Sequence, residues 1–273
     1  MQSVEVAASW PAANVAVAVV SSGGVAGSLG DQQRVFPLAS VTKLLTSYAV
    51  LVAVEEGAVE WDQPAGPPGA TVRHLISHTA GYAFDKAEVQ AEPGTRRIYS
   101  NAGFDVLAAF VEAACEMPFA TYLHEAVFVP LGMKSSALVG SAGAGAESCA
   151  ADLALFAAEL LAPSLVSSSL VREATSAVFP GLNGVLPGYG MQKPNDWGLG
   201  FEIRAGKSPH WTGNTSSPRT FGHFGQSGTF LWVDPEISAA CVALTDLRFG
   251  PWAVEAWTPF SDGVRAELVS RRA

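Results

Sequence analysis

The chain is poor in charge, and above all in positive charge. Charged residues make up 15% of its 273 positions, and 16 Lys and Arg face 25 Asp and Glu, which gives a formal net charge of -9. No basic run is present that could neutralise a phosphate backbone. The composition therefore argues against nucleic acid as a partner.

Cysteine is also scarce. The three cysteines, Cys115, Cys149 and Cys241, lie far apart in apolar surroundings. Their odd number and wide spacing fit neither a disulfide framework nor a metal knuckle, so we interpret them as small buried hydrophobic residues.

Long apolar runs are missing too, and no stretch has the uninterrupted length that a membrane span needs. The N-terminal MQSVEVAASWPAANVAVAVVSSGG lacks a positively charged start, and Glu5 and Pro11 precede its apolar run, which disfavours a signal peptide. We expect a cytoplasmic protein if the chain is complete, and an exported one if a leader has been removed. The sequence leaves the oligomeric state open.

Strand patterns lie at both ends of the chain. Residues 15–20 and 25–28 are rich in β-branched residues and flank a glycine turn, which predicts a hairpin. Near the other end, an amphipathic helix is expected at 261–271. Before it, strand patterns occupy residues 197–203, 220–224, 228–233 and 238–245.

The middle of the chain is mainly helical. A Pro- and Gly-rich crossing, WDQPAGPPG, leads into helices expected at 71–78, 102–115, 120–127, 150–161 and 165–177. This order predicts an α+β fold: an antiparallel sheet flanked by helices and built from both termini, with an inserted helical region. The expected domains are residues 1–60 with 197–273, and residues 61–196, and the cleft between them is the expected site.

A single charge interrupts the stretch FPLASVTKLLTSYAVLVAVEEG, which predicts a buried helix from Ser40 to Glu56. That charge is Lys43, and its position three residues after Ser40 predicts that the two side chains share one helix face within hydrogen-bonding range. A desolvated lysine has a lowered pKa and can accept a serine proton or hold another base deprotonated. In the alternative, purely structural interpretation, Ser40 caps the helix and Lys43 snorkels to the surface.

A second polar triplet, Tyr99-Ser100-Asn101, precedes the helix expected from Ala102. As structure, Asn101 would be an N-cap and Tyr99 a core aromatic. As chemistry, a phenol beside a lysine can act as a general base, and an asparagine amide can orient a substrate carbonyl.

The third candidate is His223-Phe224-Gly225, on a strand where the glycine would let a substrate approach the backbone closely. The N–H of Gln226 would then join the N–H of Ser40 in holding an oxyanion. Other aromatic residues of the region are assigned to the core, whereas the motif predicts that Phe224 lies beside the cleft.

Ser-x-x-Lys, Tyr-Ser-Asn and His-x-Gly, in this order, resemble the motifs of the serine β-lactamase and penicillin-binding protein superfamily, in particular its class C-like branch. The flanks VFPLASVTK, LISHTAGY and GTFLWVDPE extend the resemblance over about residues 15–252. It implies a small acyl substrate and an acyl-enzyme on Ser40. Lys43 and Tyr99 would shuttle the proton, water would release the acyl group, and neither metal nor organic cofactor would be needed.

The third motif departs from the Lys-Thr-Gly of class C β-lactamases. An unperturbed histidine at 223 is mostly neutral at pH 7, and Phe224 offers no hydrogen bond to a substrate carboxylate. A protonated His223, Arg96 or Arg97 could restore only part of an anion-binding site. An ester or amide is thus favoured over a β-lactam; the alternatives are a D-alanyl carboxypeptidase or D-aminopeptidase, and a penicillin-binding sensor that turns over slowly.

Two further patterns in the sequence could indicate other chemistry. His74 and His78 are one helical turn apart, but no Glu follows His74 and no third ligand is evident, so we expect a structural turn and no metal site. Ser227 lacks the Gly-x-Ser-x-Gly spacing of a nucleophile elbow and is expected to be a polar residue near the cleft.

Overall fold

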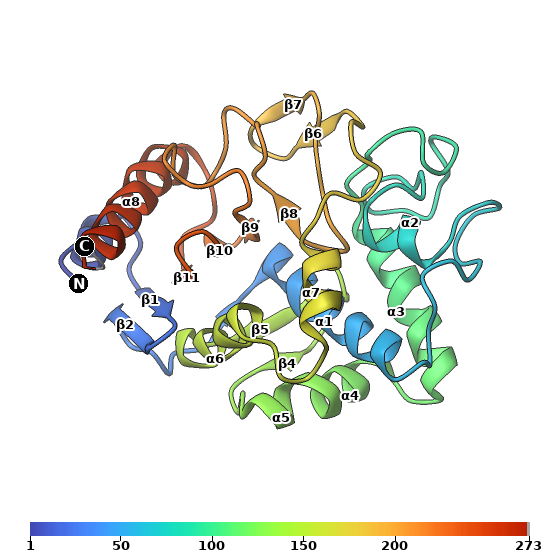
Figure 1. The fold of residues 1–273 in the computed structure, drawn as a ribbon, viewed down its shortest axis with the longest axis horizontal. Helices are drawn as coiled ribbons and strands as arrows, with labels where there is room; N and C mark the ends of the chain where they lie inside the picture. The colour runs from blue at the N-terminus through green and yellow to red at the C-terminus, as the bar shows by residue number, and fades with distance from the viewer. Residues whose placement is uncertain (272–273) are drawn as a thin grey trace.

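A computed structural model describes residues 1–271, and its centre is an antiparallel sheet with strand order β2-β1-β11-β10-β9-β8 (Figure 1). Strand β1 pairs with β11 from Val15 opposite Thr245 to Ser21 opposite Ala239, so the two ends of the chain meet in the middle of the sheet. This confirms the predicted α+β fold. The strands are β1 Val15–Ser21, β2 Gly24–Leu29, β8 Glu202–Ile203, β9 Phe221–Gly225, β10 Thr229–Asp234 and β11 Ala239–Thr245.

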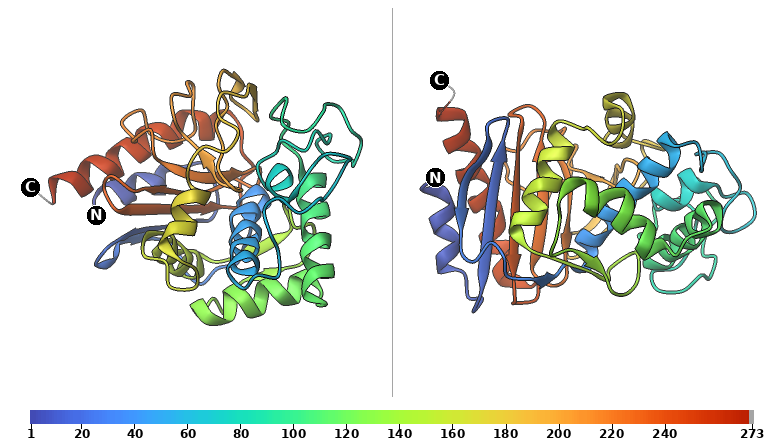
Figure 2. Two further views of the ribbon diagram at one scale, coloured as in Figure 1. Left: turned by 45° about the vertical axis from the view of Figure 1, so that its right-hand side comes forward. Right: turned by 90° about the horizontal axis from the view of Figure 1, so that it is seen from below.

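Helices cover both faces of the sheet (Figure 2). Because side chains alternate along a strand, Val17 and Val19 of β1 pack on one face with α8 (Pro251–Ser270), while Ala16 and Ala18 join the core on the other. The second face is covered by α6 (Ala150–Leu161). Beyond α6 lies the helical region of the chain.

Helix α1 (Thr42–Glu55) runs through the centre of that region and is buried at every position from Thr42 to Ala53. Its apolar residues surround the helix, which is the pattern expected of a fully enclosed one. The other helical elements, in chain order, are the 3₁₀ turn Ala39–Val41, α2 (Val72–Ile76), α3 (Asn101–Cys115), α4 (Phe119–Leu123), a π turn (His124–Phe128), α5 (Val129–Leu131) and α7 (Ser168–Ala174).

Short strands also occur outside the central sheet. They are β3 (Phe36–Pro37), β4 (Ala137–Leu138), β5 (Ala146–Ser148), β6 (Gly184–Leu186) and β7 (Gly190–Gln192). Within residues 1–271 no single helix combines the length and apolar character of a membrane span. One pair bent by 81°, α3 with Phe119–Leu131, meets the length and composition criterion jointly.

Several elements differ from the sequence-based expectation, and three of them belong to the terminal parts of the chain or to the central sheet. The C-terminal helix begins at Pro251, ten residues before the predicted start, and Pro259 lies inside it. The strand expected at 197–203 is reduced to Glu202–Ile203. A 3₁₀ helix at Ser3–Ser9, absent from the prediction, packs against α8.

Candidate active site

Ser40 lies in the 3₁₀ turn that leads into α1, and this turn sits directly against β9. A Cβ atom at Gly225 would be 2.3 Å from the carbonyl oxygen of Leu38. The same oxygen accepts a hydrogen bond of 2.9 Å from Thr229 Oγ1. Gly225 therefore makes room for the turn that carries Ser40, in addition to any approach by a substrate.

Tyr99 is the direct hydrogen-bond partner of Ser40. Its phenol donates to Ser40 Oγ at 2.7 Å, and His223 Nε2 lies 3.2 Å from the same phenol oxygen. Burial raises the pKa of Tyr99 above its usual value, so at neutral pH the group is a phenol that donates. The ring is held by His78 and Trp197, at centroid distances of 4.6 and 5.8 Å.

Lys43 is fully buried, and its hydrogen bonds differ from the prediction. Its Nζ donates to Asn101 Oδ1 at 2.6 Å and to the carbonyl of Gly143 at 2.7 Å, while the predicted hydrogen bond with Ser40 is replaced by that of Tyr99. Nζ also lies 4.5 Å from the centroid of the Tyr99 ring. Burial lowers the pKa of Lys43 to about 7, although the charges of nearby aspartates oppose this shift.

Asn101 is free to bind Lys43 because a different residue caps α3. The hydroxyl of Ser100 accepts from the N–H of Gly103 at 2.9 Å, so Ser100 is the N-cap and Asn101 the first helical residue. The amide nitrogen of Asn101 donates to Asp85 Oδ1 at 3.1 Å. That bond fixes the orientation of the amide, which leaves its oxygen directed at Lys43.

Gly143 is a site residue that sequence reasoning missed. The loop that carries its carbonyl is held by Asp105, which accepts from Ser141 Oγ at 2.7 Å and from the N–H of Ala142 at 3.0 Å. Thr46 of α1 donates to the carbonyl of Ala142 at 2.7 Å. A backbone acceptor in a loop leaves no side-chain signature, so no motif could have identified it.

His223 is buried and held in one tautomer. Its Nδ1 lies 2.6 Å from the carbonyl oxygen of Phe224, and because a carbonyl only accepts, the proton belongs on Nδ1. Nε2 then carries the lone pair of the ring and lies 3.2 Å from the Tyr99 phenol oxygen, whose single proton can be donated to Ser40 Oγ or to Nε2 but not to both at once. Burial, together with the charge of Lys43, lowers the pKa of His223 to about 3, so the ring is neutral at physiological pH.

The expected place of Phe224 beside the cleft is wrong. Alternation along β9 turns its side chain to the face opposite His223, where it is 5% exposed and packs 4.9 Å from Phe249 and 5.9 Å from Trp257, centroid to centroid. Gln226 follows β9 directly, and its carbonyl accepts from the N–H of Phe249. The proposed oxyanion role of the Gln226 N–H stays a prediction.

Of the two neighbouring arginines, only Arg96 is available to a ligand. Arg97 is 2% exposed, and its guanidinium donates hydrogen bonds to the carbonyl oxygens of Ser77, Val178 and Phe179. Arg96 lines an open cavity of about 540 Å³ that reaches Tyr99. Exposed apolar side chains share this lining: Phe84, Val185 and Met191.

Both residues of the histidine pair form local hydrogen bonds. His74 Nδ1 is 2.9 Å from the hydroxyl of Thr71 at the start of α2, and His78 Nδ1 accepts from the N–H of Ser100 at 3.2 Å. Burial lowers the pKa of both rings. In the part of the chain that is described, no three His, Cys, Asp or Glu side chains gather as a metal site would require.

The fold and this cluster define the class of protein: a sheet built from both chain ends, with a Ser, Lys and Tyr cluster where it meets a helical region, is typical of serine hydrolases of the β-lactamase and penicillin-binding type. The model of the Beta-lactamase family matches residues 8–260, and the chain belongs to that family.

Comparisons with individual proteins agree with the family. A crystal structure of a beta-lactamase from Mycobacterium bovis is 56% identical, with a TM-score of 0.97 over 97% of this chain and 99% of that one. Penicillin-binding protein 4* of Bacillus subtilis (strain 168) is 26% identical over 37% of this chain and 30% of its own length. The D-alanyl-D-alanine-carboxypeptidase/endopeptidase AmpH of Escherichia coli (strain K12) is 27% identical over 36% and 35%. The matches thus span about a third of these two curated relatives.

Proposed function

We propose that this member of the Beta-lactamase family is a serine hydrolase that forms an acyl-enzyme on Ser40 and cleaves a carboxylic ester or amide. The observation that carries the proposal is the position of the Tyr99 phenol, 2.7 Å from Ser40 Oγ and 3.2 Å from His223 Nε2. Side chains from three separate motifs thus meet at the Tyr99 hydroxyl, and this phenol contacts the Ser40 hydroxyl as an activating group beside a nucleophile would.

The proton of Ser40 passes to Lys43, either directly or through the phenol oxygen of Tyr99. With a pKa of about 7, a large share of Lys43 is the neutral amine at physiological pH. A neutral amine has two N–H bonds and one lone pair. Because Asn101 and the carbonyl of Gly143 accept the two N–H bonds, the lone pair is left free to take a proton.

The two half-reactions then balance. Ser40 Oγ bonds to the carbonyl carbon while its proton moves to Lys43, and the N–H groups of Ser40 and Gln226 hold the oxyanion. The carbon–oxygen or carbon–nitrogen bond of the substrate breaks, and the leaving group takes the proton. Water attacks the acyl-enzyme in the same way, and Ser40 regains a proton as the acid leaves.

The state of the third motif supports a substrate that is uncharged near His223. His223 is neutral and directs its lone pair at Tyr99, and Phe224 is turned into the core. Neither can bind a carboxylate. The cavity next to Tyr99, with its exposed apolar lining, suits an apolar acyl or alcohol group instead.

A carboxypeptidase-like activity is the second candidate, and Arg96 is the observation that favours it. Its guanidinium forms no ion pair within residues 1–271 and lines the cavity beside Tyr99. A substrate with a terminal carboxylate, such as a peptide that ends in D-alanine, could bind there. Arg96→Gln would abolish that activity and leave hydrolysis of a neutral ester intact.

The test compares turnover of a chromogenic cephalosporin, a short-chain nitrophenyl ester and a D-alanyl-D-alanine peptide by the wild type and by Ser40→Ala. We expect the ester to be the best substrate and Ser40→Ala to be inactive. Full activity of Ser40→Ala would overturn the nucleophile, and fast cephalosporin turnover would overturn the substrate preference. Intact-mass spectra recorded over time identify a protein that is acylated once and does not turn over.

A further inference from the structure

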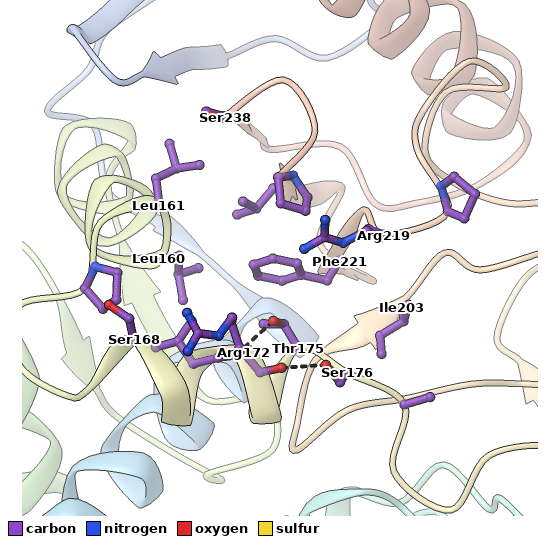
Figure 3. Close-up of a pocket in the computed structure, with 16 residues that line it drawn as sticks. Leu160, Leu161, Ser168, Arg172, Thr175, Ser176, Ile203, Arg219, Phe221 and Ser238 are labelled. Carbon is purple, nitrogen blue, oxygen red and sulfur yellow. Dashed lines mark hydrogen bonds between the residues drawn. The ribbon is translucent and has the colours of Figure 1, made fainter.

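A second cavity, of about 520 Å³, lies away from the Ser40 cluster (Figure 3). It is bounded by α6 and α7 on one side and by β8, β9 and β10 with their connections on the other. It shares no lining residue with the cavity beside Tyr99. Its volume falls in the range of roughly 300–1,000 Å³ that is usual for small-molecule sites.

The inner wall of this cavity is apolar and preformed. Leu160 of α6, Phe221 of β9 and Val233 of β10 line it, and all three belong to the main hydrophobic core. Their buried positions mean that packing on the protein side fixes these side chains. An apolar group placed against them would be removed from water without rearrangement of the wall.

Two arginines supply the charge of the cavity. Arg172 of α7 and Arg219, which precedes β9, are exposed, and neither forms an ion pair within residues 1–271. Figure 3 shows both side chains at the hollow, with Arg219 beside the Phe221 ring and Arg172 across from it, near Leu160.

Among the described residues, no acidic side chain shares the lining of this cavity with the two arginines. The chain carries 25 Asp and Glu, yet none is among the described residues that line the cavity. On the same helix, Glu173 follows Arg172, but its carboxylate forms a salt bridge with Arg73, with 3.0 Å between Oε1 and Nη1. Two uncompensated guanidinium groups above an apolar wall therefore form a local positive site in a chain of net charge -9.

We propose that this cavity binds a small amphipathic carboxylate, such as a medium-chain fatty acid. The aliphatic chain would lie against Leu160, Phe221 and Val233. The carboxylate would accept hydrogen bonds from Arg172 and Arg219, since the guanidinium fork matches carboxylate geometry. The site is separate from Ser40 and does not depend on the proposed hydrolase activity.

The probe is sodium decanoate, with decan-1-ol as its uncharged counterpart, titrated by calorimetry into the wild type, Ser40→Ala and an Arg172→Gln/Arg219→Gln double variant. We expect decanoate to bind the wild type and Ser40→Ala equally, with an affinity that falls as salt rises. The double variant should bind at least about tenfold more weakly, the change expected when charge-assisted bonds are lost. Decanol should show no difference between the proteins.

Two further variants make the result decisive. Ala177→Trp fills the cavity from an exposed lining position and should also abolish binding, whereas Arg96→Gln, at the cavity beside Tyr99, should have no effect. Weakening by Arg96→Gln and not by the double variant would place decanoate at the catalytic cleft and overturn the proposal. Equal affinity for decanol and decanoate, or no binding by the wild type, would also overturn it. Thermal melts confirm that each variant is folded.

Discussion

Lys43 and Gly143 are 100 positions apart in the chain, yet the carbonyl of the glycine accepts a hydrogen bond of 2.7 Å from the buried ammonium of the lysine. Asn101 provides the second acceptor, at 2.6 Å. These two contacts take up two of the three N–H bonds of the ammonium form. They leave one lone pair free in the amine form, so the protonation state of Lys43 decides whether it can act as a base.

The pH dependence of ester hydrolysis follows from this. The neutral amine is the active form, so kcat/KM should rise with pH through about 7 and then level off. His223, whose pKa is about 3, should add no step between pH 5 and 9. A pH–rate profile measures both. Lys43→Arg should be inactive throughout, since a guanidinium stays charged, and a profile that falls through pH 7 would contradict the assignment.

The charge next to Lys43 can be changed in both directions. Asn101→Asp places a carboxylate where the amide oxygen now accepts, which should raise the pKa of Lys43 and move the acid limb of the profile upward by at least about one unit. Asp85→Asn removes a charge that now raises the same pKa, so the acid limb of the pH–rate profile of this variant should move to lower pH. Shifts of the same sign in both variants would show that Lys43 does not control the limb.

Loss of the Tyr99 hydroxyl should abolish most activity. Tyr99→Phe removes the group that contacts Ser40 Oγ, and kcat should fall by about 100-fold or more, the usual cost of losing an acid–base group. Tyr189→Phe is the matched control, because the buried Tyr189 hydroxyl has no hydrogen-bond partner among residues 1–271. If the two variants were equally active, Tyr99 would be a packing residue only.

The sequence order of the motifs predicted which side chains would meet, but not the finer contacts. Serine and asparagine are both good N-caps, and nothing in Tyr-Ser-Asn decides between them; the structure places Ser100 at the cap and Asn101 against Lys43. Likewise, neighbours on a strand cannot share a face. His223 points towards Tyr99, so Phe224 had to enter the core, although the motif alone predicted both at the cleft.

Lys43 should also give the folded protein a specific pH dependence of stability. Its pKa is near 10.5 in the unfolded chain and about 7 in the folded one, so between these values the unfolded chain binds more protons and stability rises with pH. Lys43→Met lacks this titration. We compare the free energy of unfolding of the wild type with that of Lys43→Met. The difference should change in favour of the wild type by up to about 1.4 kcal/mol per pH unit from pH 7.5 to 9.5. Denaturant titrations at three pH values measure it, and a constant difference would refute the shift.

The close contact between β9 and the turn that carries Ser40 predicts a strong effect of one methyl group. In Gly225→Ala the new Cβ would meet the Leu38 oxygen at 2.3 Å and Thr229 Oγ1 at 2.5 Å. Because the first of these is a backbone atom, the turn has to move, and displacement of Ser40 from the Tyr99 phenol should reduce kcat by roughly 100-fold, as small misplacements of a nucleophile do.

Gly206→Ala is the control for this variant, since a Cβ there would meet nothing within 4 Å. It should retain wild-type activity and melting temperature. The thermal midpoint of Gly225→Ala separates a displaced turn from an unfolded protein. A folded Gly225→Ala enzyme with full activity would mean that the turn can shift without moving Ser40 away from Tyr99, and that the glycine serves the approach of the substrate alone.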